Sequence, residues 1–176
     1  MKAMAFELFY RLDNTDRIVE TGGAWNQFAK ENAGTELLGS AVIGRSLYDF
    51  IHGDVSRMFV RTLVDGVRIL NRPRVVPYRC DSPGLRRYME MSITCEPGGG
   101  ILLEHRQVRE ETISRNFDFK VGVRGASQLI VRCSHCNTVK KNGVWGEPET
   151  VLPEGDKLVP VIYGVCETCL NLVKRR

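Results

Sequence analysis

The feature that most constrains this fold is a pair of CxxC motifs in the last quarter of the chain. Cys133 and Cys136 form the first motif, Cys166 and Cys169 form the second, and 29 residues lie between them. A CxxC turn directs both sulfur atoms toward one point, and two such turns supply the four thiolates that tetrahedral Zn²⁺ accepts. The pattern therefore predicts one structural zinc site, although the interval exceeds the usual spacing of about 15 to 20 residues.

Two other interpretations of these cysteines remain. A thiol redox switch would place one CxxC motif beside a βαβ pattern, and no such pattern surrounds either motif. Four unrelated buried thiols would need apolar neighbours, whereas Ser134, Glu167 and Thr168 between the sulfurs are polar. His135 also lies between two ligands, so we expect it to be an exposed loop residue and not a ligand. Zinc binding explains the pattern best.

Composition places the chain among soluble globular proteins, with 43% hydrophobic and 26% charged residues. Its 176 residues allow one domain of ordinary size and a small accessory module. No apolar run approaches the ~18 residues of a membrane span, and residues 1–7 do not resemble a secretory signal. Together with paired CxxC turns, this predicts a cytoplasmic protein without a membrane segment.

Apolar spacing predicts an order of elements for the first half of the chain. Residues 6–12 and 17–20 have the content of two strands joined by a polar turn. A short helix is expected over 25–32, and the apolar residues of 47–51 fit one further helical turn. A long helix follows Asp54, its expected N-cap, and ends at Asn71, before a proline.

The pattern then changes to a period of two residues, which is typical of strands. Three strands are expected over 74–80, 85–95 and 101–108, separated by turns rich in glycine and proline. Alternation along the second of these strands indicates that one face of the sheet is buried. The whole order is two strands, several helices and three antiparallel strands.

This order, with Gly44–Ile51 before the long helix, resembles the PAS family. The segments Tyr10–Asp13, Ala24–Ala29 and Pro77–Pro83 resemble a bacterial branch in which a PAS domain precedes a cysteine module. The resemblance implies an α+β fold: a five-stranded antiparallel sheet with helices on one face and a possible ligand cavity between them.

Beyond the sheet, residues 110–116 read as a polar connector that extends the last strand as a helix, and 117–123 as a further strand or arm. Asn142-Gly143 favours a tight hairpin turn. Pro148, Pro153 and Pro160 are expected to interrupt regular structure, and a terminal helix is expected from Leu170.

The C-terminal segment resembles a zinc ribbon, so a small β-rich zinc module is expected. In the bacterial branch a His-Gly precedes the second cysteine pair, whereas this chain has Tyr163-Gly164. We divide the chain into a PAS-like sensory domain over 1–110, a connector over 111–128 and a Cys₄ zinc module over 129–176.

A ligand cavity in the PAS-like domain would be lined by large apolar side chains, although the same residues could fill a solid core. His52 and His105 are candidates for a haem ligand, but we do not expect haem. Cys80 and Cys95 read as small buried apolar residues. The candidate cavity residues are Trp25, Phe28, Phe50, Phe59, Tyr78, Met89, Met91 and His105.

Catalysis finds no support in the sequence, which has no phosphate-binding glycine loop, no HExxH and no GxSxG motif. A Cys₄ zinc site also leaves no position for an activated water. We therefore expect a sensory or protein-interaction module that acts in signal transduction by association, as a homodimer or with a signalling protein.

Two alternative functions remain open. A thiol redox switch is one. The other is a nucleic-acid-binding transcriptional regulator whose zinc module contacts phosphates. The net charge of +4 lies wholly in residues 120–176, but four zinc-bound thiolates would reduce it, so this support is weak. The basic residues concerned are Lys140, Lys141, Lys174, Arg175 and Arg176.

Overall fold

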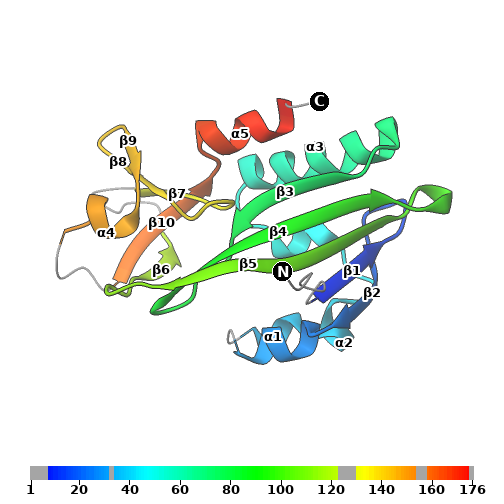
Figure 1. The fold of residues 1–176 in the computed structure, drawn as a ribbon, viewed down its shortest axis with the longest axis horizontal. Helices are drawn as coiled ribbons and strands as arrows, with labels where there is room; N and C mark the ends of the chain where they lie inside the picture. Colours follow the sequence, from blue (N-terminus) through cyan, green and yellow to red (C-terminus); the bar gives the residue numbers. More distant parts are fainter. Residues whose placement is uncertain (1–7, 32–33, 123–129, 154–157, 175–176) are drawn as a thin grey trace. The chain divides into compact units, whose positions relative to one another are not determined.

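The computed structural model describes residues 8–31, 34–122, 130–153 and 158–174 (Figure 1). Two compact units are distinguished by the contacts between residues. Both units draw on separate stretches of the chain. The first contains Met1–Ile51, Arg61–Tyr78 and Tyr88–Arg109, and the second contains His52–Val60, Arg79–Arg87 and Glu110–Arg176.

The N-terminal part of the chain forms an α+β arrangement with a five-stranded sheet. The sheet has the order β2-β1-β5-β4-β3. Its strands are β1 (Leu8–Leu12), β2 (Ile18–Gly23), β3 (Arg74–Arg79), β4 (Leu85–Cys95) and β5 (Ile101–Thr112). Between β2 and β3 lie α1 (Trp25–Glu31), η1 (Thr35–Leu37), α2 (Gly39–Val42), η2 (Leu47–Phe50) and α3 (Asp54–Leu70), and η3 (Pro97–Gly99) joins β4 to β5.

The sheet is antiparallel, as the sequence predicts. Strand β1 pairs antiparallel with β2 and with β5, and short turns connect β3 to β4 and β4 to β5. The first hairpin turn is closed by Asp13, whose carboxylate accepts hydrogen bonds from the backbone N–H groups of Thr15 and Arg17. The hydrogen bond from Arg17 is the main reason that the pKa of Asp13 is lowered.

One face of this sheet is buried and the other is partly exposed. Leu8, Tyr10 and Leu12 alternate with half-buried residues along β1. Their partners on β5 are His105, Leu103 and Ile101, which are buried as well. The indole of Trp25 packs edge-on against Tyr10, so α1 lies against the buried face. The period-two pattern in the sequence identifies this face correctly.

Helix α3 is the longest helix among the described residues, and the sequence predicts it. Leu63, Val64 and Val67 are buried along one side. Asn71 directly after it has a φ of +48°, the left-handed conformation that ends a helix and that asparagine tolerates.

A second five-stranded sheet has the order β6-β10-β7-β8-β9. Strand β10 is parallel to both β6 and β7, whereas β7–β8 and β8–β9 are antiparallel. Its elements are β6 (Asp118–Val121), β7 (Ile130–Cys133), β8 (Val139–Lys141), β9 (Val144–Gly146), α4 (Pro148–Val151), β10 (Leu158–Gly164) and α5 (Glu167–Lys174). The core of this sheet is apolar and consists of Ile130, Val139, Leu152, Val159 and Val161.

Two expectations about local structure are wrong. Strand β5 continues to Thr112 where a helical extension is expected, and there Glu111 forms a 2.7 Å ion pair with Arg86 of β4. Pro160 lies inside β10 and does not break it. Among the described residues, Pro160 pairs with Lys120 of β6 and the pairing of β10 with β7 is seen from Val161 onward, so no described β7 residue requires the missing N–H of proline.

Other features of the C-terminal segment are as predicted. Asn142 and Gly143 both have positive φ, the conformation of a two-residue hairpin turn between β8 and β9. The predicted connector contains β6, which belongs to the second sheet. The division into 1–110, 111–128 and 129–176 stays a prediction, and residues 123–129 lie outside the described part.

No helix in the described part of the chain is both long enough and apolar enough to span a membrane.

The buried His105 makes the stability of the protein depend on pH. Burial lowers the pKa of His105 to about 4 from an ordinary value near 6.5. The unfolded chain therefore takes up this proton first as the pH falls. We expect His105 to remove about 3 kcal/mol from the free energy of unfolding between pH 6.5 and 4.

Urea unfolding at several pH values measures this effect. His105→Gln should flatten the dependence by about one proton, because glutamine does not titrate and can still form a hydrogen bond with the Tyr78 hydroxyl, which lies 2.8 Å from Nδ1 of His105. The same change at the exposed His52 is the control and should keep the wild-type slope. Equal slopes in all three proteins would contradict the assignment.

Candidate metal centre

The two CxxC motifs are brought together by the parallel pairing of β7 and β10. In the register of this pair, Cys133 at the end of β7 lies beside Gly164 at the end of β10. Because the strands run in the same direction, their carboxyl ends meet at one edge of the sheet. Each motif begins within two residues of that edge, so the fold juxtaposes all four thiols.

The first motif is a tight turn closed by backbone hydrogen bonds. The N–H of Cys133 donates to the Thr138 carbonyl at 2.8 Å, and the N–H of Asn137 donates to the Cys133 carbonyl at 3.0 Å. Asn137 has a φ of +62°, which asparagine adopts more readily than most residues. The N–H of Ser134 donates to the Gly164 carbonyl at 2.9 Å, which ties this turn to β10.

The second motif begins α5. The carbonyl of Cys166 accepts a hydrogen bond from the N–H of Leu170, and Cys169 lies in the first turn of the helix. The N–H of Cys166 also points to the Cys133 sulfur at 3.4 Å. A helix N-terminus carries positive partial charge and therefore stabilises thiolates placed there.

The four sulfur atoms form a compact cluster that fits a tetrahedral metal ion. All four Sγ atoms lie within 4.8 Å of one another, and those of Cys136 and Cys166 are 3.6 Å apart. Four thiolates at a Zn–S distance of about 2.3 Å would be about 3.8 Å from each other. The donor set and its spacing therefore suit a closed Cys₄ site.

Burial makes a cation necessary if all four sulfurs are ionised. Cys133, Cys166 and Cys169 are buried, and Cys136 is half-buried. Burial raises the pKa of Cys166 to about 11, whereas hydrogen bonds from the Cys133 and Cys169 thiols lower the pKa of Cys136. Thiolates this close repel one another, and a divalent ion that binds all four compensates the repulsion.

The sequence does not identify the residues that hold the first motif in place. The hydroxyl of Thr138 lies 3.1 Å from the Cys136 sulfur. His135 is buried, with 8% of its surface exposed, so the expectation of an exposed loop residue is wrong. Its ring packs edge-on against Phe59 at 4.9 Å, and its carbonyl accepts a hydrogen bond from the N–H of Arg79. These contacts are long-range, so residue spacing cannot show them.

Gly53 makes a close contact with the strand that leads to the second motif. A Cβ atom at Gly53 would lie 2.8 Å from the carbonyl oxygen of Tyr163, and the φ of Gly53 is +85°. The ring of the neighbouring His52 stacks on that of Tyr163 at 6.0 Å. Only glycine fits at this position, for reasons of both space and backbone conformation.

The residues predicted to line a ligand cavity are all at least half-buried. Phe59, Met89, Met91 and His105 are buried, and Trp25, Phe28, Phe50 and Tyr78 are half-buried. His105 lies between Tyr10, on which it stacks, and Tyr78, which hydrogen-bonds to it. The Trp25 indole donates to the Leu37 carbonyl. These contacts describe a packed cluster, and a ligand among these residues stays a prediction.

The remaining candidates lie in different places. Cys80 and Cys95 are half-buried, and burial raises the pKa of Cys80. The ammonium group of Lys140 forms an ion pair with Glu167 at 3.7 Å and lies 5.6 Å from the centre of the Trp145 ring. Lys141 is half-buried and Lys174 exposed, while Arg175 and Arg176 lie outside the described residues.

Two solved structures similar to this chain are those of the PAS domain of the Cronobacter turicensis RpfR quorum-sensing receptor, one in complex with C12:0 and one in complex with BDSF. Each is 14% identical, has a TM-score of 0.45, and is matched over 62% of this chain and 100% of its own. The sequence matches no protein-family profile and no curated protein. The function of this chain is therefore inferred from its own geometry.

Replacement of one cysteine in the cluster should release the metal. Purified protein should contain about one zinc per chain, and Cys169→Ser should weaken zinc binding by more than about 100-fold, because a buried ligand is lost. Zinc content and competition with a chromophoric chelator measure both quantities. Cys95→Ser in β4, outside the cluster, is the control and should keep full zinc content. Equal zinc content in both variants would contradict the site.

Substitution at Gly53 tests the packing beside β10. Gly53→Ala should lower the free energy of unfolding by about 2 to 4 kcal/mol, because the methyl group meets the Tyr163 backbone and the left-handed conformation is disfavoured. Gly143→Ala has nearly the same φ, +84°, but open space around it, and should cost only about 1 kcal/mol. Urea unfolding of both variants would show whether this difference exists.

Proposed function

We propose that this chain is a non-catalytic signalling module in which zinc holds the C-terminal sheet in shape. The observation that carries the proposal is the cluster of four thiols within 4.8 Å at the carboxyl ends of β7 and β10. A site with four protein ligands leaves no place for water or substrate on the metal, so the ion contributes to folding and not to a reaction.

The first sheet supports a sensory or binding role in this proposal. A PAS-type module acts by presenting its sheet and flanking segments to a ligand or partner, which shifts the population of its conformations. The five-stranded antiparallel sheet agrees with the resemblance of the sequence to that family. We infer that the signal passes by association in the cytoplasm, to a second copy of this chain or to a signalling protein.

If zinc has a structural role, its removal should destabilise the fold of the second unit. A strong chelator should lower the unfolding temperature, and near-UV circular dichroism should change because Trp145 and Tyr163 belong to the second unit. Added zinc should reverse both effects. Reversible metal loss without any change in stability would contradict a structural role.

Sedimentation velocity and native mass spectrometry of the zinc-loaded protein test the association. A concentration-dependent dimer with two zinc ions would support the proposal. A monomer at every concentration that binds no partner would overturn the associative part and leave the metal site intact. Disulfide formation in place of metal would instead favour the redox switch.

A further inference from the structure

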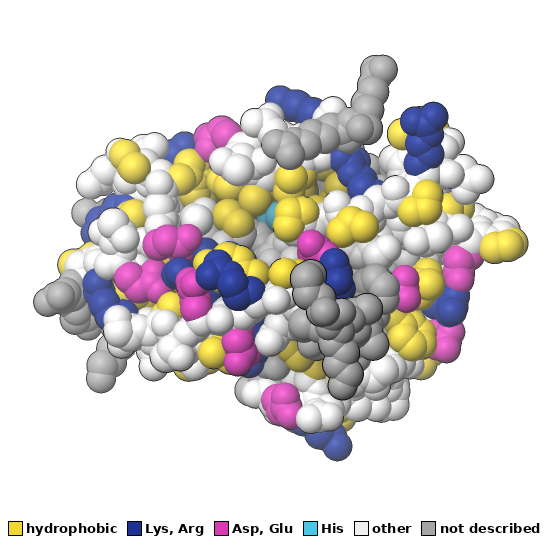
Figure 2. Space-filling view, in the orientation of Figure 1, with side chains coloured by type: hydrophobic (Ala, Val, Ile, Leu, Met, Phe, Trp, Pro, Cys, Tyr) yellow, Lys and Arg dark blue, Asp and Glu magenta, His cyan; other side chains and the backbone are white. Residues whose placement is uncertain are grey.

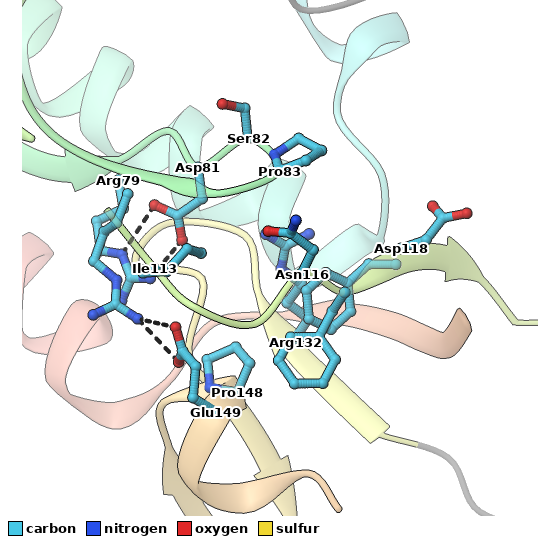
Figure 3. A pocket seen from close by; sticks show the side chains of 13 residues that line it. Arg79, Asp81, Ser82, Pro83, Ile113, Asn116, Asp118, Arg132, Pro148 and Glu149 are labelled. Carbon is cyan, nitrogen blue, oxygen red and sulfur yellow. Dashed lines mark hydrogen bonds and ion pairs between the residues drawn. The ribbon is translucent and has the colours of Figure 1, made fainter. Parts of the chain in front are cut away.

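A cavity of about 620 Å³ lies within the second unit, apart from the four cysteines (Figure 3). This volume is within the range of small-molecule sites. Its lining comes from the end of β3, the start of β4 and the turn between them, from the segment between β5 and β6, and from parts of β6, β7 and α4. Phe117 and Phe119, whose ring centres are 5.8 Å apart, belong to its lining, and Asn116 adds an amide.

Two of the three arginines in the lining are neutralised. The guanidinium of Arg79 pairs with Asp81 at 2.5 Å and with Glu147 at 2.8 Å. That of Arg86 pairs with Glu149 at 2.8 Å and with Glu111 at 2.7 Å. Figure 3 shows such pairs as dashed lines along one side of the cavity. These charges hold the walls together and are not available to a ligand.

Arg132 is different, because it has no ion pair with any residue of the described ranges. It is half-buried, and its Nε atom is buried without a hydrogen-bond partner there. Its guanidinium stacks on the Phe119 ring at 4.1 Å. The carboxylate of Asp118 lies 3.5 Å from Lys120 and points away from the other labelled side chains in Figure 3.

Burial is the main reason that the pKa of Arg132 is lowered. The carboxylate of Asp81 and the guanidinium of Arg79 act on it in opposite directions, and these two groups already form a pair. The nearby Tyr163 hydroxyl also interacts with Arg132, as a side-chain hydrogen-bond partner. A positive charge thus remains at the cavity wall, and withdrawing a charge from water without a counter-ion costs free energy.

We propose that this cavity binds a small organic carboxylate, with its carboxylate group on Arg132 and its apolar or aromatic body against Phe117 and Phe119. A guanidinium stacked on a ring keeps its donors at the edge, where those that Tyr163 does not use can donate to the oxygens of a carboxylate. The amide of Asn116 provides a further donor at the rim. This site goes beyond the proposed function and does not involve the predicted aromatic cluster.

Calorimetric titration of the zinc-loaded full chain with three probes tests the proposal. Benzoate combines the charge with a ring, benzamide keeps the ring without the charge, and inorganic phosphate is an anion without an apolar body. Benzoate should bind, and the other two should bind about tenfold more weakly or less, because each lacks one of the two interactions. Equal binding of benzoate and benzamide, or no binding of benzoate at millimolar concentration, would overturn it.

Variants locate the binding. Arg132→Gln should weaken benzoate binding about tenfold or more, and Asn116→Ala, in a segment outside the strands, should weaken it several-fold. Arg106→Gln removes an arginine of the first unit and should have no effect. Zinc content shows whether each variant is folded. If Arg132→Gln does not fold, Asn116→Ala still tests the site. Unchanged binding in both cavity variants, or equal losses in all three, would disprove the site.

Discussion

The parallel pairing of β7 with β10 is the interaction on which the second unit depends. It aligns Cys133 with Gly164, and the four sulfurs then fall within 4.8 Å of one another. If all four thiols are ionised, they repel one another. In the proposed zinc-bound protein the ion would compensate this repulsion, so the strand pairing and the metal would support each other.

Local order in this protein could be predicted from sequence, because it rests on neighbouring residues. The alternation along β4, the apolar stripe of α3 and the Asn142-Gly143 turn each leave a signature within a short window. The grouping of the four cysteines could be predicted for the same reason, since CxxC spacing is a local signature. Sequence reasoning thus predicted the first sheet and the proximity of the four thiols, and metal binding stays a prediction.

The rest depends on contacts between distant segments. Pro160 led to the prediction of a break in regular structure. The pairing of β10 with β6 and β7 shows that a strand forms there instead. The burial of His135 follows from Phe59 and Arg79, which lie more than 50 residues earlier in the chain. The unneutralised charge of Arg132 could not be recognised either, because it depends on which carboxylates are already paired with Arg79 and Arg86.

The parallel register also has a consequence for folding kinetics. Strands β7 and β10 are separated by the whole of β8, β9 and α4, so the chain must close a long loop before their pairing yields any stabilisation. Hairpins β7–β8 and β8–β9 can form earlier from local contacts. In the proposed zinc-bound protein, an ion held by the first cysteine pair would keep the second pair nearby during this search. The metal would then accelerate folding as well as stabilise its product.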